Sequence, residues 1–330
     1  MTMDGQEAGS KLLSVVVPLY NEQAVITAFH ERLAAVLDQL GLAAEVIYVN
    51  DGSTDRSLPL LLDLRRRDPR VAILELSRNF GKELALTAGL DHARGNAVIV
   101  IDADLQDPPE LIPELIEGWH KGYDVVSAQR TAREGESWLR RLTAAAFYHL
   151  LARSAPAPVP RDTGDFRLLS RRAVDATNAL RERHRMMKGL FAWIGFAQLS
   201  VPYRRGPRHA GRSKWSYWKL WNLAIEGLTS FTTAPLRFAS YLGAAIALLS
   251  FAYAAVIVYK TLVYGDPVRG YPSLMVTVLF LGGVQLLSLG VIGEYLGRIF
   301  NEAKRRPLYL VSRYLPPGNE EIGGAPTPQG

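Results

Sequence analysis

Short runs rich in Val and Ile alternate with helical stretches over the first 130 residues of the chain. The runs are mostly apolar on both faces, which is typical of strands buried in a parallel sheet. They cover residues 12–17, 45–49, 71–76, 97–101 and 124–128. Helical patterns lie between them, near residues 23–40, 54–66, 81–93 and 109–120. Such alternation predicts a doubly wound α/β sheet whose ligands bind beyond the carboxyl ends of the strands.

Two long apolar runs follow in the last third of the chain. Residues 239–259 and 272–293 contain no charged side chain, and each run is as long as the roughly 20 residues that a helix needs to cross a bilayer. We therefore expect transmembrane helices at about 238–263 and 272–296. Basic residues are concentrated outside this pair, so the positive-inside rule predicts a hairpin with both flanks in the cytoplasm.

Two further segments have an amphipathic pattern. Residues 136–153 fit either an interfacial membrane helix or an ordinary surface helix, and residues 215–231 carry the Trp and Tyr side chains that favour lipid headgroups. Gly293 and Gly297 permit close helix packing within the hairpin or between subunits, which leaves a homo-oligomer open.

These patterns divide the chain into four parts. We expect a flexible amino terminus, a catalytic domain that includes the two amphipathic helices, the transmembrane hairpin and a cytoplasmic tail. Their ranges are 1–11, 12–233, 234–300 and 301–330.

Charge and cysteine content exclude several classes of protein. The 330 residues carry a net charge of +6 and include no cysteine, so disulfides, thiolate metal sites and cysteine nucleophiles are excluded. The basic residues gather in 204–219 and 298–313, beside the apolar runs. This position favours a membrane surface and phosphorylated ligands over nucleic acid.

The strongest chemical signal is a pair of aspartates at the end of a buried strand. Asp102 and Asp104 are two residues apart, and carboxylates this close repel each other unless a cation neutralises them. Hard oxygen ligands suit Mg²⁺ or Mn²⁺, with phosphate oxygens completing the shell, and Gln106 can add a neutral oxygen. Asp107 and Glu110 instead have the spacing of a capping box at a helix start.

Other polar residues follow the remaining strands. Asp51 lies at a strand end, where its carboxylate faces the expected ligand crevice, and Asn21-Glu22 invites the same interpretation. Lys82 after the third strand and Arg130 and Arg133 after the fifth are candidates for phosphate contacts, although charges at such junctions are common.

Six motifs together resemble the family 2 glycosyltransferases. They are PLYNE (18–22), NDGSTD (50–55), RNFGKE (78–83), DADLQDPPE (102–110), GDFRL (164–168) and RHAGRSKW (208–215). Within that family the chain is similar to the polyprenyl-phosphate branch, which includes dolichol-phosphate mannose synthases and bacterial undecaprenyl-phosphate glucosyltransferases. The resemblance implies a GT-A fold (Rossmann-like, with a mostly parallel sheet) followed by juxtamembrane helices and a two-helix hairpin.

The resemblance also implies roles for individual residues. Those implied to bind the nucleotide-sugar are Pro18, Tyr20, Glu22, Asp51, Lys82, Asp102 and Asp104. Those implied to hold the metal are Asp102, Asp104 and Gln106. Those implied to bind the acceptor or donor phosphates are Arg130, Arg133, Arg208, Ser213 and Lys214. Asp165 matches the position to which the family assigns a catalytic role, and Asp104 shares in catalysis through the metal.

The activity implied is inverting transfer of a sugar from a nucleotide-sugar to undecaprenyl phosphate. The protein would be a multi-pass protein of the bacterial inner membrane with its catalytic domain in the cytoplasm. UDP-glucose is the first choice of donor, while GDP-mannose and other UDP-sugars stay open. A non-catalytic membrane scaffold is the alternative from another class. A processive polysaccharide synthase is disfavoured, because the chain has no Gln-x-x-Arg-Trp motif and only two apolar runs.

Overall fold

The structure is a computed structural model that describes residues 12–130, 163–183, 185–203 and 270–318, with scattered residues of 241–263. The described residues form two compact units. One unit contains the described residues of 12–203 and of 306–318, and the other contains the described residues of 241–305.

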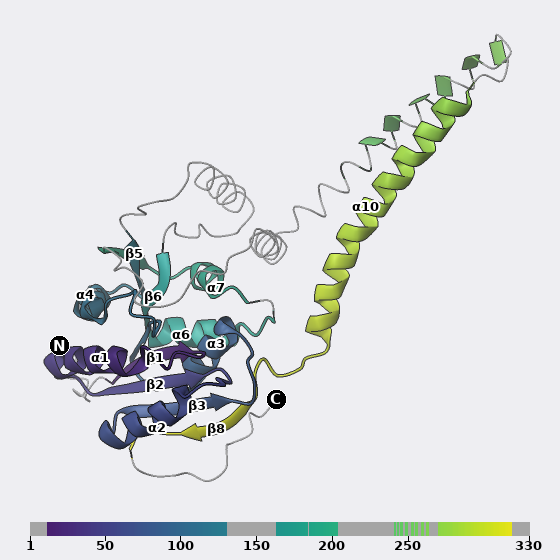
Figure 1. Cartoon of the computed structure of the whole chain (residues 1–330). Helices are drawn as coiled ribbons and strands as arrows, with labels where there is room; N and C mark the ends of the chain where they lie inside the picture. Colours follow the sequence, from purple (N-terminus) through teal and green to yellow (C-terminus); the bar gives the residue numbers. More distant parts are fainter. Residues whose placement is uncertain are drawn as a thin grey trace. The chain divides into compact units, whose positions relative to one another are not determined.

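The first half of the sheet follows the pattern expected from the sequence (Figure 1). Four strands pair in parallel in the order β3-β2-β1-β4. They are β1 (Leu13–Leu19), β2 (Ala44–Asn50), β3 (Val71–Leu76) and β4 (Ala97–Val100). The connecting helices are α1 (Ile26–Leu40), α2 (Ser57–Arg67) and α3 (Lys82–His92). The predicted doubly wound α/β arrangement is confirmed here.

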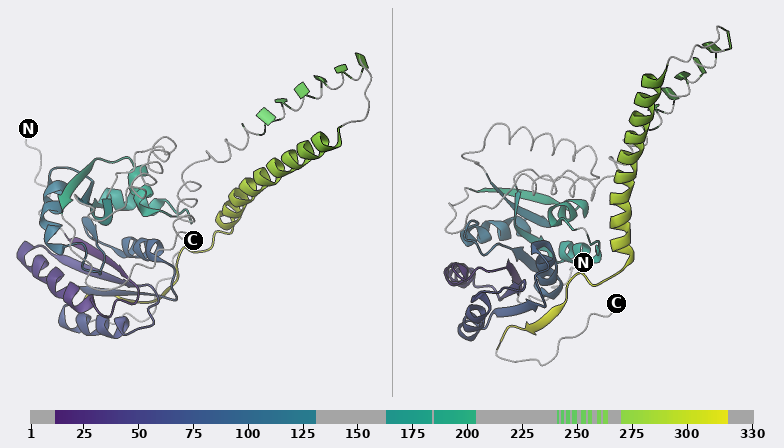
Figure 2. Two further views of the ribbon diagram at one scale, coloured as in Figure 1. Left: turned by 45° about the horizontal axis from the view of Figure 1, so that its top comes forward. Right: turned by 45° about the vertical axis from the view of Figure 1, so that its right-hand side comes forward.

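Helices cover both faces of this sheet, which gives three layers (Figure 2). Val15 and Val17 face α1, α2 and α4 (Ile112–His120), whereas Val16 faces α3. All three valines are fully buried, as their two-sided apolar pattern predicts.

The second half of the sheet contains a strand of opposite direction. After β5 (Val125–Arg130), strand β6 (Thr163–Ser170) inserts antiparallel between β4 and β5, and β7 (Gln198–Tyr203) then pairs in parallel with β5. Val100 of β4 lies opposite Arg167 of β6. Continued by two residues, this antiparallel register directs Asp102 and Asp165 toward the same point beyond the sheet.

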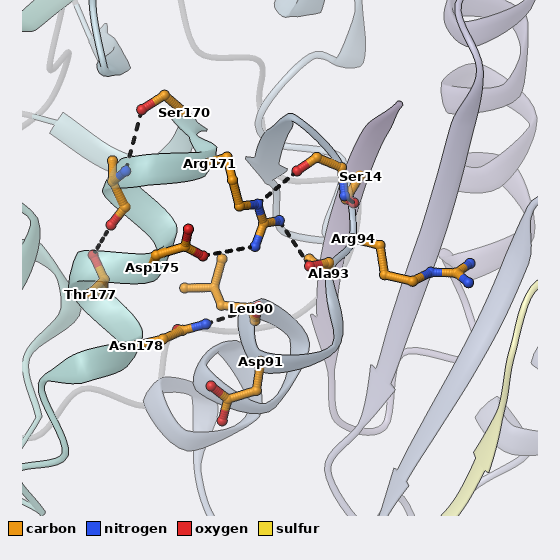
Figure 3. Close-up of polar contacts among 12 residues, drawn as sticks. Ser14, Leu90, Asp91, Ala93, Arg94, Ser170, Arg171, Asp175, Thr177 and Asn178 are labelled. Carbon is orange, nitrogen blue, oxygen red and sulfur yellow. Dashed lines mark hydrogen bonds and ion pairs between the residues drawn. The ribbon is translucent and has the colours of Figure 1, made fainter. Parts of the chain in front are cut away.

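Strand β6 is held in place through the helix that follows it (Figure 3). Arg171, the first residue of α6 (Arg171–Ala179), donates to the carbonyl oxygens of Ala93 at 2.8 Å and Gly95 at 2.9 Å. Asn178 donates to the carbonyl oxygen of Leu90 at 3.2 Å. These bonds tie α6 to the end of α3 and to the turn before β4.

The other edge of the sheet is closed by a strand from the far end of the chain. Strand β8 (Val311–Leu315) pairs antiparallel with β3 and completes an eight-stranded sheet in the order β7-β5-β6-β4-β1-β2-β3-β8. Ser77 donates to the Leu310 carbonyl at 2.9 Å, and the Tyr309 hydroxyl donates to Asp91 at 2.7 Å. These residues were expected to form a cytoplasmic tail, and strand β8 was not predicted.

The second unit contains the long helix α10 (Tyr271–Ala303). Within the described residues it is the one helix whose length and composition suit a membrane span, over Phe280–Ala303. The described residues between 241 and 263 are helical. The two-helix transmembrane hairpin therefore stays a prediction. The amphipathic segments 136–153 and 215–231 lie outside the described residues.

Candidate active site

A cleft of about 300 Å³ opens at the carboxyl ends of β1, β2 and β4. Its wall includes all seven residues implied to bind a nucleotide-sugar: Pro18, Tyr20, Glu22, Asp51, Lys82, Asp102 and Asp104. The remaining lining residues include Asn79 and Gly81 from the β3–α3 connection and Ala85 from α3. Parallel strands bring these distant positions to one edge of the sheet, where such folds bind ligands.

The loops after β1 and β2 fix each other by hydrogen bonds. The Asn21 side-chain oxygen accepts from the backbone N–H groups of Thr54 at 2.8 Å and Asp55 at 3.3 Å, while the Asn21 N–H donates to the Ser53 hydroxyl at 3.0 Å. Asn21 has a φ of 56°, a left-handed conformation that asparagine adopts more readily than most residues. The neighbouring Tyr20 is thereby held at the mouth of the cleft.

Asp51 anchors the loop that leads into α3. Its two carboxylate oxygens accept from the backbone N–H groups of Phe80 at 2.7 Å and Gly81 at 2.9 Å. Burial raises the pKa of Asp51, and these two hydrogen bonds oppose that rise. Asp51 therefore holds the backbone just before Lys82 in place, independently of any contact that it makes with a nucleotide.

Lys82 links two carboxylates at the centre of the site. Its ammonium lies 2.7 Å from an oxygen of Asp102 and 2.6 Å from an oxygen of Asp165. These residues come from α3, the end of β4 and the start of β6, and the register of β4 with β6 brings the two aspartates together. Asp165 does not itself line the cleft, but it contacts Lys82, which does line it.

The two aspartates titrate in opposite directions. Burial would raise the pKa of Asp165, but the positive charges of Lys82 and Lys188 outweigh it and lower that pKa to about 2. Burial raises the pKa of Asp102; Lys82 opposes the rise, and the negative charges of Asp165 and Asp107 add to it. Environments that separate two carboxyl groups in this way are typical of catalytic sites.

Three charged residues beside this pair were not predicted from the sequence. Glu83 accepts from the backbone N–H of Met187 at 3.0 Å, and Lys188 lies 3.8 Å from the second oxygen of Asp165. Arg167 is fully buried, stacks 4.5 Å from the centre of the Phe191 ring, and has its pKa lowered to about 10 by that burial. Their partners lie tens of residues away along the chain, so only the folded sheet reveals these contacts.

Residues 102–107, which follow β4 and are called the aspartate loop below, contain side chains of the types that bind metal ions. Within the described residues, no group of three or more His, Cys, Asp or Glu side chains is arranged to hold a metal. Asp102 and Asp104 fit two carboxylate ligands of a hard divalent ion, provided that diphosphate oxygens supply others. Gln106 is buried and is not among the residues that line the cleft, so its predicted ligand role requires the loop to rearrange.

The backbone of this loop is strained. Leu105 has a φ of 59°, which is rare for a bulky side chain and typical of functional loops. The Asp104 carboxylate accepts from the backbone N–H of Gln106 at 3.0 Å and so stabilises the turn.

The predicted capping box is wrong. Asp107 is buried and accepts a hydrogen bond from the Tyr203 hydroxyl, while Glu110 pairs with Arg32 at 2.8 Å. No side-chain cap is found at the short 3₁₀ helix η1 (Pro109–Leu111) that begins here. Asp107 and Glu110 thus bind to Tyr203 on β7 and to Arg32 on α1, respectively, and not to backbone groups at the start of the helix.

The predicted acceptor-binding residues fall mostly outside the described part of the chain. Arg133, Arg208, Ser213 and Lys214 lie outside the described residues, and Arg130 is described only as the last residue of β5. Their roles stay predictions.

Comparisons with known proteins agree with this geometry. The family model described as glycosyl transferase family 2 matches residues 14–177, and a model described as GtrB C-terminal hairpin matches residues 234–299. An uncharacterised glycosyltransferase of Synechocystis sp. is 54% identical over 92% of this chain and 97% of that protein. The chain belongs to glycosyl transferase family 2.

Relatives within the family have more specific names. The bactoprenol glucosyl transferase of Shigella phage SfII is 48% identical over 91% of this chain and 97% of that protein. A prophage bactoprenol glucosyl transferase homologue of Escherichia coli K12 is 45% identical over 91% and 98%, respectively. A crystal structure of glucosyl-3-phosphoglycerate synthase from Mycobacterium tuberculosis, in complex with Mn²⁺, UDP-glucose and phosphoglyceric acid, gives a TM-score of 0.45 at 21% identity. It covers 68% of this chain and 82% of that one.

Family membership confirms two expectations. The chain is a glycosyltransferase, and its catalytic unit has the α/β GT-A-like fold with a mostly parallel sheet that the resemblance implied.

Proposed function

We propose that this family 2 glycosyltransferase transfers glucose from UDP-glucose to a polyprenyl phosphate, with inversion at the anomeric carbon. The observation that carries the proposal is the similarity to bactoprenol glucosyl transferases, which extends over nearly the whole chain and includes the carboxyl-terminal hairpin. The acid-lined cleft at the sheet edge supplies a site for the donor.

The donor binds in the cleft, with its diphosphate toward the aspartate loop. Asp102 and Asp104 would hold Mg²⁺ or Mn²⁺ there, joined by Gln106 if the loop rearranges. When bound, such an ion would supply positive charge to the departing diphosphate. Lys82 adds a second positive charge at the same end of the cleft, 2.7 Å from Asp102.

An oxygen of the acceptor phosphate attacks the anomeric carbon of glucose, and UDP leaves as the bond to its diphosphate breaks. This nucleophile is already anionic near neutral pH, so the reaction does not require a strong general base. Asp165 suits such a reaction, because its pKa of about 2 makes it a poor proton acceptor. We assign it to fixing Lys82 and to stabilising positive charge that develops at the anomeric carbon.

The acceptor is a membrane lipid, and the second unit of the chain supplies the anchor. Helix α10 carries apolar side chains that are exposed in the structure, among them Leu286 and Leu289. With the apolar run 239–259 it would form a two-span hairpin in the bacterial inner membrane. The positive-inside rule would put the basic flanks in the cytoplasm, which supports a cytoplasmic catalytic unit. Arg130, Arg133, Arg208, Ser213 and Lys214 would bind phosphates near that surface.

The test is transfer of radiolabelled sugar by the purified full-length protein in detergent, with undecaprenyl phosphate as acceptor. UDP-glucose, UDP-N-acetylglucosamine and GDP-mannose are supplied separately, each with Mn²⁺ or with EDTA. We expect a lipid-linked product from UDP-glucose that is lost in EDTA. A product from another donor would reassign the sugar, and no product from any donor would favour the non-catalytic scaffold.

A further inference from the structure

The Lys82 ammonium is bound to one of the two carboxylates proposed to hold the divalent ion. It donates a hydrogen bond to Asp102 at 2.7 Å, and the Asp102 side chain is only 22% exposed. A hard divalent ion also binds a carboxylate oxygen directly. Two cations on one carboxylate repel each other, and they do so more strongly in a partly buried site than in water. Lys82 and the ion therefore compete for Asp102.

The two carboxylates that contact Lys82 differ in how much they depend on it. Asp165 has a second cation nearby, because Lys188 of α7 (Met187–Trp193) lies 3.8 Å from its other oxygen. Among the described residues, Lys82 is the only cation within ion-pair distance of Asp102. If Lys82 leaves Asp102, that carboxylate therefore needs another cation beside it, and the divalent ion is one.

The backbone at Lys82 is fixed, whereas its side chain can turn. Asp51 holds the backbone N–H groups of Phe80 and Gly81 directly before it. The Lys82 side chain is 44% exposed, and its ammonium carries three N–H donors on a flexible four-carbon stem. Lys82 also lines the donor cleft. Its ammonium can therefore reach an anion in the cleft without any movement of α3.

We propose that Lys82 competes with the divalent ion for Asp102 until the donor diphosphate draws the ammonium away. The proposal rests on the proposed function, in which Asp102 and Asp104 bind the donor through an ion. Without the donor, Lys82 neutralises Asp102 and weakens ion binding. The diphosphate gives Lys82 another anionic partner and supplies the ion with oxygen ligands that the two aspartates do not.

This exchange makes the binding of ion and donor cooperative. A donor that removes Lys82 from Asp102 raises the affinity for the ion, and linkage requires that the ion raises the affinity for the donor by the same factor. Asp102 is paired with a cation both before and after the exchange. Lys82 is thus the side chain that links the two binding events.

The experiment measures the Kd of Mn²⁺ alone for the full-length protein in detergent, from the electron paramagnetic resonance signal of free Mn²⁺ and without nucleotide. We expect Lys82→Met to bind Mn²⁺ at least fivefold more tightly than the wild type, because the competing charge is gone. Lys82→Arg keeps that charge and should bind as weakly as the wild type. Lys121→Met is the matched control and should also match the wild type, because Lys121 pairs with Glu117 on the surface.

Two further measurements locate the effect. Adding Asp102→Asn to Lys82→Met should abolish the gain in Mn²⁺ affinity. UDP should tighten Mn²⁺ binding to the wild type, after correction for the Mn²⁺–UDP complex in solution, and the factor should be smaller in Lys82→Met.

Two results would overturn the proposal. One is a gain in Mn²⁺ affinity smaller than fivefold, or a loss, in Lys82→Met; the other is a gain that persists when Asp102 is also replaced. Should the methionine variant not fold, Lys82→Gln carries the same expectation. Glucose transfer that is insensitive to EDTA would refute the metal role in the proposed function, and this inference with it. EDTA-sensitive transfer by the wild type, with unchanged Mn²⁺ affinity in Lys82→Met, would refute the inference alone.

Discussion

Replacing Lys82 by methionine removes the charge that two partly buried carboxylates share while keeping a side chain of similar length. The lowering of the Asp165 pKa from 3.8 to about 2 corresponds to about 2 kcal/mol of stabilisation of the folded protein at neutral pH. Lys82 is the largest favourable contributor to that lowering. Asp102 loses a counter-charge as well, so we expect Lys82→Met to lose at least about 2 kcal/mol.

The pH dependence of this loss has a definite sign. A carboxyl group with a lowered pKa in the folded state stabilises the protein above its unfolded pKa of about 4, and the contribution disappears as the pH falls through 2. At pH 3 about half of the Asp165 contribution remains. The difference between wild type and Lys82→Met should therefore be largest at pH 7 and should shrink in acid.

The assay is thermal unfolding of the full-length protein in detergent at pH 7, 5 and 3. For a domain of this size, about 2 kcal/mol corresponds to a decrease in Tm of about 4 to 8 °C at pH 7. Lys121→Met, which removes an exposed ion pair, should leave the Tm unchanged. An unchanged Tm in Lys82→Met at pH 7, or a decrease in Tm that grows in acid, would show that Lys82 does not stabilise the protein through these carboxylates.

Three further predictions concern the frame around the site. Gly89→Ala should destabilise the protein by about 1–3 kcal/mol in chemical denaturation, because the added Cβ would lie 2.2 Å from a Val16 methyl group; wild-type stability would contradict the close packing. Asp51→Asn should weaken UDP-glucose binding in calorimetry and cost about 1–3 kcal/mol of stability, because an amide cannot accept both loop N–H groups; equal binding and stability would count against this anchor. Tyr309→Phe removes the hydroxyl that donates to an α3 carboxylate, and it should lower stability by about 1 kcal/mol. No change in its melting curve would mean that this hydroxyl bond does not help to hold the β8 segment.

The parallel half of the fold was predictable because its signals are local. Strands such as β1 are apolar on both faces, and the helices between them carry periodic apolar positions, so burial follows directly from the sequence pattern. The residues at the strand ends were also predictable as a group, since parallel strands place their carboxyl ends together. Seven of them line one cleft.

The antiparallel strands and the ion pairs were not predictable in this way. Strand β8 pairs with β3 from a position more than 230 residues later, and its short sequence resembles the end of a tail. Lys82 and Asp165 are 83 residues apart, and they meet only because β6 inserts beside β4. Asp107 shows the same limit, since a tertiary bond to Tyr203 replaced the local cap that its spacing suggested.

The proposed function depends above all on Asp102 and Asp104 binding the donor diphosphate through a divalent ion. Calorimetric titration of UDP-glucose into the full-length protein, with Mn²⁺ or with EDTA, tests it most directly. We predict that EDTA lowers the affinity at least 10-fold, and that an Asp104→Asn variant binds equally weakly in both conditions. Wild-type affinity that is the same with Mn²⁺ and EDTA would contradict the account.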